Sequence, residues 1–109
     1  MTMDDEKAIK DFKKLVNMTP NKLEAWLDTD ESKKVGFKDG GEGESVGHKS
    51  GKKIIKLLAK KTDDYTAADL KHIHKVAGYI SRHLAQKPDG DIMETNWRYS
   101  LMNWGHDPA

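Results

Sequence analysis

Apolar side chains recur at intervals of three and four residues in several segments of the chain, with polar side chains between them. This spacing is typical of amphipathic α-helices, in which residues three and four apart share one face. The most regular segment runs from Thr66 to Gln86, with apolar positions at Leu70, Ile73, Ala77, Ile80 and Leu84. Thr66 and Asp69 also match a capping box, which closes the first turn of a helix. The pattern predicts a long helix that ends before Pro88.

The same spacing and the helix-capping residues predict four shorter helices. They are residues 4–17, a helix that Pro20 opens with Thr19 as its N-cap, a helix that ends near Lys61, and residues 91–103. The third of these begins at Ser45 or at Ser50, because residues 39–50 are rich in glycine and are predicted to form a loop. No alternating strand pattern of useful length appears. We therefore expect an all-α fold, a compact single-domain bundle of four to five helices.

The length of 109 residues allows one domain with a single small core, and we take residues 1–109 as that domain. The prediction allows residues 1–10 to be frayed. The chain has no cysteine, so it has no disulfide or thiolate metal site, and a reducing compartment such as the cytoplasm suits it. No apolar run near the first residues resembles a signal peptide, and no segment is predicted to span a membrane.

The net charge of +1 hides a strong segregation of charge along the chain. Residues 1–46 carry 8 basic and 11 acidic side chains, residues 47–88 carry 10 and 3, and residues 89–109 carry 1 and 4. The middle of the chain therefore has a net charge of +7 between two ends of −3 each. Such a chain can present one anion-binding side, unless the acidic ends fold back and neutralise it.

Most of the positive charge of the middle region lies on one predicted helix. Five lysines share an arc of about 100° on it, opposite the apolar positions. These five, which we call the lysine face, are Lys49, Lys52, Lys53, Lys56 and Lys60. The glycines and Ser50 near its start are predicted to offer N–H groups and a hydroxyl to a phosphate oxygen. The face is unneutralised by any acid within the helix and favours a polyanionic partner.

The long predicted helix carries a second basic face on the side opposite its apolar stripe. Lys71, Lys75 and Arg82 form it, with Tyr79 and Gln86 among them. These residue types contact phosphate and sugar, and Arg and Gln also read base edges. An ordinary solvated helix face is an equal alternative. An apolar stripe with this spacing more often packs in the core of its own chain, although it would also suit the seam of a homodimer.

Three other groups of residues in the sequence give weaker indications of a functional site. The segment GHKSGKK has only three residues between its glycines, so it does not match a Walker phosphate loop. The five histidines lack the spacing of a metal site, since His72 and His74 point in different directions on a helix. A hydrolytic set built from Ser50, His48 and an aspartate has no nucleophile elbow to support it. We therefore expect no enzymatic activity, no metal and no cofactor.

Tryptophans Trp26, Trp97 and Trp104 are expected mainly to anchor the core. Trp104 is the least certain of the three. If it and Tyr99 were exposed, they could stack on bases or on the aromatic groups of a partner.

Four blocks of the sequence also carry a resemblance, and they occur in the order MTPNKLEAWL, ESVGHKSGKKIIKLLAKK, KHIHKVAGYISRHLAQKP and TNWRYSLMNWGHDP. They resemble the bacterial family catalogued as domain of unknown function 3140, over roughly residues 18–108. The resemblance implies no established reaction and no functional residues. Some members of that family carry a loose label of DNA-binding protein, which agrees with the lysine face.

The sequence thus favours a helical, non-enzymatic protein that binds DNA, mainly through its phosphates and without sequence preference. The residues expected to carry this binding are Lys49, Ser50, Lys52, Lys53, Lys56, Lys60, Lys71, Lys75 and Arg82. The alternative is a protein-interaction module, either a homodimer or an adaptor for an acidic partner, whose basic helix docks onto acidic residues.

Overall fold

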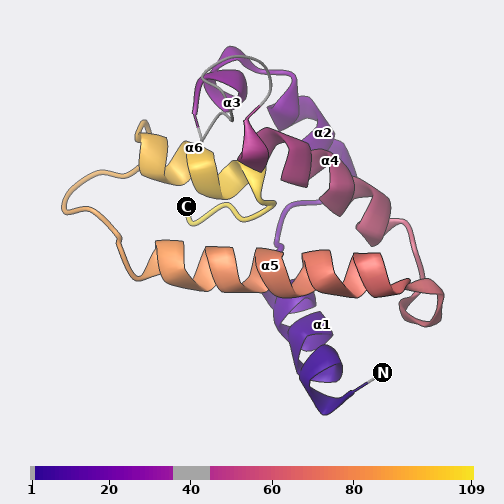
Figure 1. Ribbon diagram of the computed structural model, residues 1–109. Helices are drawn as coiled ribbons and strands as arrows, with labels where there is room; N and C mark the ends of the chain where they lie inside the picture. The colour runs from indigo at the N-terminus through magenta and orange to yellow at the C-terminus, as the bar shows by residue number, and fades with distance from the viewer. Residues whose placement is uncertain (1, 36–44) are drawn as a thin grey trace.

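Helices account for all the regular structure in residues 2–35 and 45–109, the part of the chain that the computed structural model describes (Figure 1). They are α1 (Met3–Leu15), α2 (Pro20–Leu27), α3 (Asp30–Lys34), α4 (Val46–Leu58), the 3₁₀ helix η2 (Thr62–Asp64), α5 (Ala67–Leu84) and α6 (Asn96–Asn103). No strand occurs in this part of the chain, which confirms the predicted all-α class.

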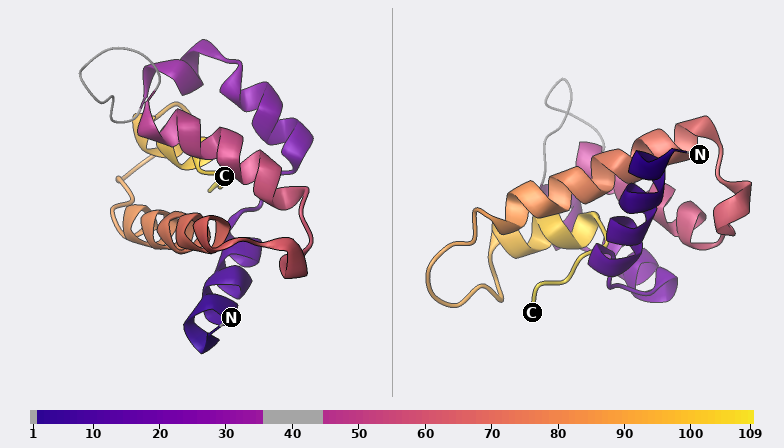
Figure 2. Two further views of the ribbon diagram at one scale, coloured as in Figure 1. Left: turned by 45° about the vertical axis from the view of Figure 1, so that its right-hand side comes forward. Right: turned by 90° about the horizontal axis from the view of Figure 1, so that it is seen from below.

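The helices pack in two groups that meet at the core. In one group α1 crosses α5, the longest helix, and packs on one side of it (Figures 1 and 2). In the other group α2 packs on α4, and α6 contacts α2, α3 and α4. Helix α6 also packs on α5 and so joins the two groups. The molecule measures 39 × 29 × 27 Å along its principal axes.

The predicted apolar stripe of α5 lies in the chain's own core. Ile73, Val76 and Ile80 have no exposed surface, and they contact buried residues of the other helices. Val76 belongs to this stripe although the sequence pattern did not include it, whereas Leu70 and Leu84 are only partly buried. Because the core covers the centre of the stripe, this part is not available as the seam of a homodimer.

Side-chain caps fix the starts of the helices where the sequence predicted them. Thr66 and Asp69 form the predicted capping box of α5, and Thr19 caps α2 with Pro20 in the first turn. A capping box of Thr2 and Asp5 also closes the first turn of α1, so residues 3–10 are helical. The carboxylate of Asp5 lies 2.8 Å from Nε2 of His74 on α5 and ties the start of α1 to that helix.

The structure differs from the predicted helices in two places and decides the start of a third. Helix α3 was not predicted, although Thr29 caps it in the same way as Thr19 caps α2. The last helix begins at Asn96 rather than at residue 91, because residues 91–95 form turns before its N-cap Thr95. Helix α4 begins after its N-cap Ser45, the earlier of the two predicted starts, so residues 46–50 are helical. The rest of the predicted glycine-rich loop, residues 39–44, lies outside the described residues.

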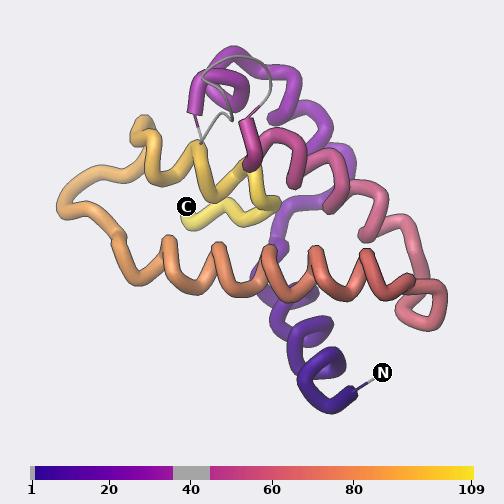
Figure 3. The backbone as a smooth tube through the Cα atoms, in the orientation of Figure 1, coloured from indigo at the N-terminus to yellow at the C-terminus, as the bar shows by residue number. Residues whose placement is uncertain are grey.

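The C-terminal segment folds back against the connection between α1 and α2 (Figure 3). Gly105 ends α6 with a φ of +83°, a left-handed conformation that glycine adopts without strain. The backbone N–H of Met18 donates to the carbonyl of Gly105 at 3.1 Å. Asn17 exchanges two hydrogen bonds with the backbone of Asp107. The fold thus brings the C-terminal segment beside the connection between α1 and α2.

Candidate nucleic-acid interface

Helix α4 carries the lysine face on its exposed side. Its buried side consists of Ile54 and Leu57, which are 0% and 3% exposed. The lysines on the opposite side are all exposed. This arrangement follows from the spacing of apolar and basic residues along the helix, as the sequence predicted.

Lys60 differs from the other lysines of this face. It lies beyond the end of α4, and its Nζ is 2.6 Å from Oδ2 of Asp69 on α5. The hydrogen bond from Lys60 lowers the pKa of Asp69, which is therefore ionised at neutral pH. Within the part of the chain that the structure describes, no ion pair involves Lys49, Lys53 or Lys56. These three are the lysines of the face with the most available charge.

Ser50 does not belong to the exposed face, so its predicted role in positioning a phosphate does not fit the structure. Its side chain is 2% exposed, and its Oγ lies 2.9 Å from Nε2 of His72 on α5. Ser50 comes four residues before Ile54, so both lie on the buried side of α4. The hydroxyl links two helices instead of meeting solvent.

The glycines of α4 serve close packing rather than phosphate binding. Gly47 and Gly51 are buried on the side of α4 that faces α6 and α2. A Cβ atom on Gly51 would lie 2.6 Å from the carbonyl oxygen of Asn103 and 2.7 Å from a methyl group of Leu27. A Cβ atom on Gly47 would lie 2.9 Å from Nε1 of Trp104. The absence of side chains at these positions lets α4 approach its neighbours.

The second basic face lies along the outside of α5. Lys71, Lys75 and Arg82 are exposed and, within the described residues, take part in no ion pair. The guanidinium of Arg82 lies over Gly78, where an added Cβ would approach it to 2.9 Å. Gln86 is exposed beyond the end of α5, as the predicted face requires.

Tyr79 is the exception on this helix, since it packs inward rather than among the basic residues. Its ring stacks on Trp104 at a centroid distance of 4.1 Å, and burial raises the pKa of its hydroxyl. Trp104 is only 3% exposed and so anchors the core. Tyr99 packs beside Trp26 at 5.4 Å. Neither Tyr79 nor Trp104 is therefore available to stack on a base.

His72 lies where the two basic faces approach each other. Burial, together with the charges of Lys53 on α4 and Lys75 on α5, lowers its pKa to about 4. Helices α4 and α5 converge toward the connection that contains η2 (Figure 1). Between them lies a hollow of about 270 Å³, which we call the α4–α5 hollow. It is lined by Lys53, Lys56, Leu57, Lys60, Ala68, Asp69 and His72.

The acidic N-terminal part of the chain lies on the other flank of α4. Glu24 of α2 and Asp28, which follows this helix, line a hollow together with Lys52 and Lys56, and both acids are exposed. Lys33 of α3 lines it too. The acids therefore lie beside one edge of the lysine face, and the edge toward α5 stays basic.

The histidines make structural contacts in place of a metal site. Nε2 of His48 lies 2.7 Å from the carbonyl oxygen of Leu27, and Nε2 of His83 lies 3.2 Å from that of Trp97. No group of three potential metal ligands occurs within the described residues. Ser50 contacts His72 rather than His48, so the hydrolytic set considered from the sequence does not form.

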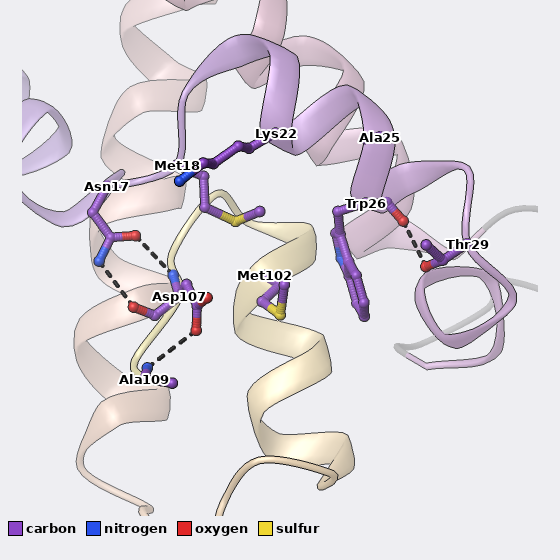
Figure 4. A pocket seen from close by; sticks show the side chains of 9 residues that line it. All are labelled: Asn17, Met18, Lys22, Ala25, Trp26, Thr29, Met102, Asp107 and Ala109. Carbon is purple, nitrogen blue, oxygen red and sulfur yellow. Dashed lines mark hydrogen bonds between the residues drawn. The ribbon is translucent and has the colours of Figure 1, made fainter.

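A separate hollow of about 550 Å³ lies between α2, α6 and the C-terminal segment (Figure 4). Met18, Trp26 and Met102 supply its apolar lining. Two of its polar residues have partners within the chain, because Asn17 forms hydrogen bonds with Asp107 and the Asp107 carboxylate pairs with Arg98 at 3.0 Å. Lys22 supplies the one lysine among the described residues that line it. This hollow is far less basic than the α4–α5 hollow.

Comparison with known proteins gives a family and nothing more specific. A family model described as "Protein of unknown function (DUF3140)" matches residues 11–102. No curated protein and no solved structure matches the chain. The matched residues include α4 and α5 and therefore both basic faces. No helix in the described part of the chain combines the length and the apolar character needed to cross a bilayer.

Proposed function

The chain belongs to the DUF3140 family, whose description gives no activity, and we propose from its basic surface that it is a non-enzymatic DNA-binding protein. The proposed contacts are to backbone phosphates and are largely independent of base sequence. The observation that supports this most is that the two helices meet at one hollow, where Lys53 and Lys56 of α4 lie beside His72 of α5. A surface built from two helices can follow successive phosphates better than one isolated helix can.

The residues proposed to bind phosphate are the exposed cations of α4 and α5. Those without an ion pair among the described residues are Lys49, Lys53, Lys56, Lys71, Lys75 and Arg82. Lys52 and Lys60 lie at the edges of the surface, next to acids of α2 and α5. Ser50 is left out because it is buried. A cytoplasmic location, which suits a chain without cysteine, is part of the proposal.

The salt dependence of binding tests this proposal. If four or five of these cations contact phosphates at once, log affinity should fall with log salt at a slope of roughly −4 to −5. Fluorescence anisotropy of a labelled duplex, measured at several salt concentrations, gives this slope. Absence of binding at low salt would refute the proposal.

A matched pair of double variants locates the site. Lys53→Gln with Lys56→Gln should weaken binding and reduce the steepness of the salt slope by about 2, because two phosphate contacts are lost. Lys10→Gln with Lys14→Gln removes the same charge from exposed positions of α1 and should leave the slope unchanged. Equal losses in both variants would mean that only net charge matters and that α4 is not the site.

The alternative, a module that binds itself or an acidic protein, has less support. The α5 stripe that suited a homodimer seam lies in the core. Among the described residues, the exposed large apolar side chains are Met3 and Met93. Self-association would therefore have to be electrostatic, with the lysine face docking onto acids of a second copy. Light scattering at low and high salt separates this alternative from DNA binding.

A further inference from the structure

The α4–α5 hollow differs from the rest of the basic surface because its lining combines charged side chains with apolar ones. Its charged residues, which we call the rim, are Lys53, Lys56 and Lys60 together with Asp69. Leu57 and Ala68 line it with apolar surface. A smooth phosphate-binding surface needs only the lysines. The apolar lining indicates a ligand that has an apolar part as well as a negative charge.

His72 contributes a flat, neutral ring to this hollow. Its pKa of about 4 keeps the imidazole uncharged at neutral pH despite the lysines around it. The hydrogen bond between its Nε2 and Ser50 Oγ holds the ring in place. An uncharged imidazole attracts a phosphate less than an imidazolium does. It suits instead the face or the polar edge of an aromatic heterocycle.

The rim charges are not distributed evenly. Asp69 pairs with Lys60 and also accepts a hydrogen bond from the backbone N–H of Thr66, so the charge of Lys60 is largely neutralised. Lys53 and Lys56 have no ion pair within the described chain. An anionic group is therefore favoured at the Lys53 and Lys56 end of the hollow.

The size of the hollow limits what can enter it. Its volume of about 270 Å³ lies just below the range of about 300–1,000 Å³ that is usual for pockets of drug-sized ligands. It therefore has room for one planar group and not for a stacked pair. Bases inside a duplex are stacked and paired, so they can enter such a site only after they leave the stack.

We propose that the α4–α5 hollow takes up the base of one unpaired nucleotide, with the adjoining phosphate against Lys53 and Lys56. This inference rests on the proposed binding of nucleic acid through phosphates and adds a preference for single strands over duplexes. The chemistry recognised is a nucleoside phosphate. Its source is a single strand or the free nucleotide, and the experiment below separates the two.

A substitution at Ala68 tests the hollow without changing any charge. Ala68 is exposed and lines the hollow, so Ala68→Leu partly fills the space for a base. Ala67→Leu is the matched control, since Ala67 is also exposed in the first turn of α5 but does not line the hollow. Thermal unfolding followed by circular dichroism verifies that both variants fold.

We expect the wild-type protein to bind a labelled oligothymidylate at least about fivefold more tightly than a duplex of equal length. Ala68→Leu should remove this preference and leave duplex affinity unchanged, whereas Ala67→Leu should keep it. Equal wild-type affinity for the two ligands, or a preference that survives Ala68→Leu, would overturn the inference while leaving phosphate binding intact. Failure to bind either ligand at low salt would overturn the proposed function itself.

An NMR titration with thymidine 5′-monophosphate distinguishes the two sources. Shifts of the Ala68 and His72 amide signals would show that the free nucleotide occupies the hollow. If these signals move only with oligothymidylate, the site belongs to a strand. If neither ligand moves them, the hollow is not the site and the inference is wrong.

Discussion

His72 couples several features of the molecule at the scale of a single residue. Its ring lies between two helices. It is hydrogen-bonded to Ser50 and close to the charges of Lys53 and Lys75. Polar side chains that are partly withdrawn from water need such a partner, because an unpaired one costs free energy. The serine and the histidine thus satisfy each other and connect α4 to α5.

The burial of His72 predicts that the stability of the protein depends on pH. The folded pKa of about 4 lies below the ordinary value of 6.5, so between these values the unfolded chain binds a proton that the folded chain does not. The free energy of unfolding should therefore decrease as the pH falls from 6.5 to 4. Partial exposure of the ring limits the loss to about 1–2 kcal/mol. Urea unfolding measured across this window gives the slope.

His72→Gln is the control for this effect, because glutamine does not titrate but still offers hydrogen-bonding atoms to Ser50. The variant should lose most of the slope between pH 6.5 and pH 4. A smaller slope should remain, since burial also lowers the pKa of His83. An identical slope in both proteins would mean that His72 is not the group responsible.

At the scale of helices, the close contact of α4 with α2 and α6 depends on Gly51. Alanine in place of glycine inside a helix usually stabilises by about 1 kcal/mol. Here the added Cβ would meet the Asn103 carbonyl oxygen and a Leu27 methyl group at 2.6 and 2.7 Å. Backbone and buried leucine have little room to move, so Gly51→Ala should lower the free energy of unfolding by about 1–3 kcal/mol.

Gly78 on α5 offers the opposite case for comparison. The atoms that an added Cβ would approach belong to the guanidinium of Arg82, the mobile end of an exposed side chain. Arg82 can move away at little cost, so Gly78→Ala should stabilise by about 0.5–1 kcal/mol. Chemical denaturation of both variants measures the contrast. Stabilisation by Gly51→Ala would show that α4 does not pack as closely as described.

The sequence predicts helices well where local chemistry determines them. The capping box of Thr66 and Asp69, and Thr19 followed by Pro20, each marked a helix start that the structure confirms. Helix α3 was not predicted because its five residues show no apolar periodicity. The glycines of α4 left the start of this helix open between Ser45 and Ser50, because glycine destabilises an isolated helix. Tertiary packing overrides that preference, and no local pattern shows it.

The candidate site was predictable where it depends on the spacing of residues within one helix. The exposed lysines follow from helical spacing within one segment. The burial of Ser50 could also have been predicted, since Ser50 lies four residues before Ile54 on the same helix face. The contacts of Ser50 with His72 and of Lys60 with Asp69 join different helices, and so does the placement of acids on α2 beside Lys52. These depend on how helices pack, which the spacing of residues does not specify.

At the scale of the whole molecule, the fold places the acids Glu24 and Asp28 beside the basic surface of α4. Glu24 and Asp28 flank one edge of the lysine face, while the edge toward α5 joins further cations. The acids lower the positive potential near Lys52 and Lys56. The near-neutral total charge therefore conceals a polarised surface.

This polarity yields a prediction for DNA binding that the total charge alone does not give. Glu24→Gln with Asp28→Asn should tighten binding about two- to fivefold at low salt, because two repulsive charges next to the lysine face are removed. The gain should shrink as salt screens these charges. Asp89→Asn with Glu94→Gln makes the same charge change at exposed positions in the connection between α5 and α6 and should have a smaller effect. Equal gains in both variants would mean that DNA responds only to net charge. Weaker self-association of the α2 variant without tighter DNA binding would favour a protein partner instead, since the lysine face would then use these acids on a second copy.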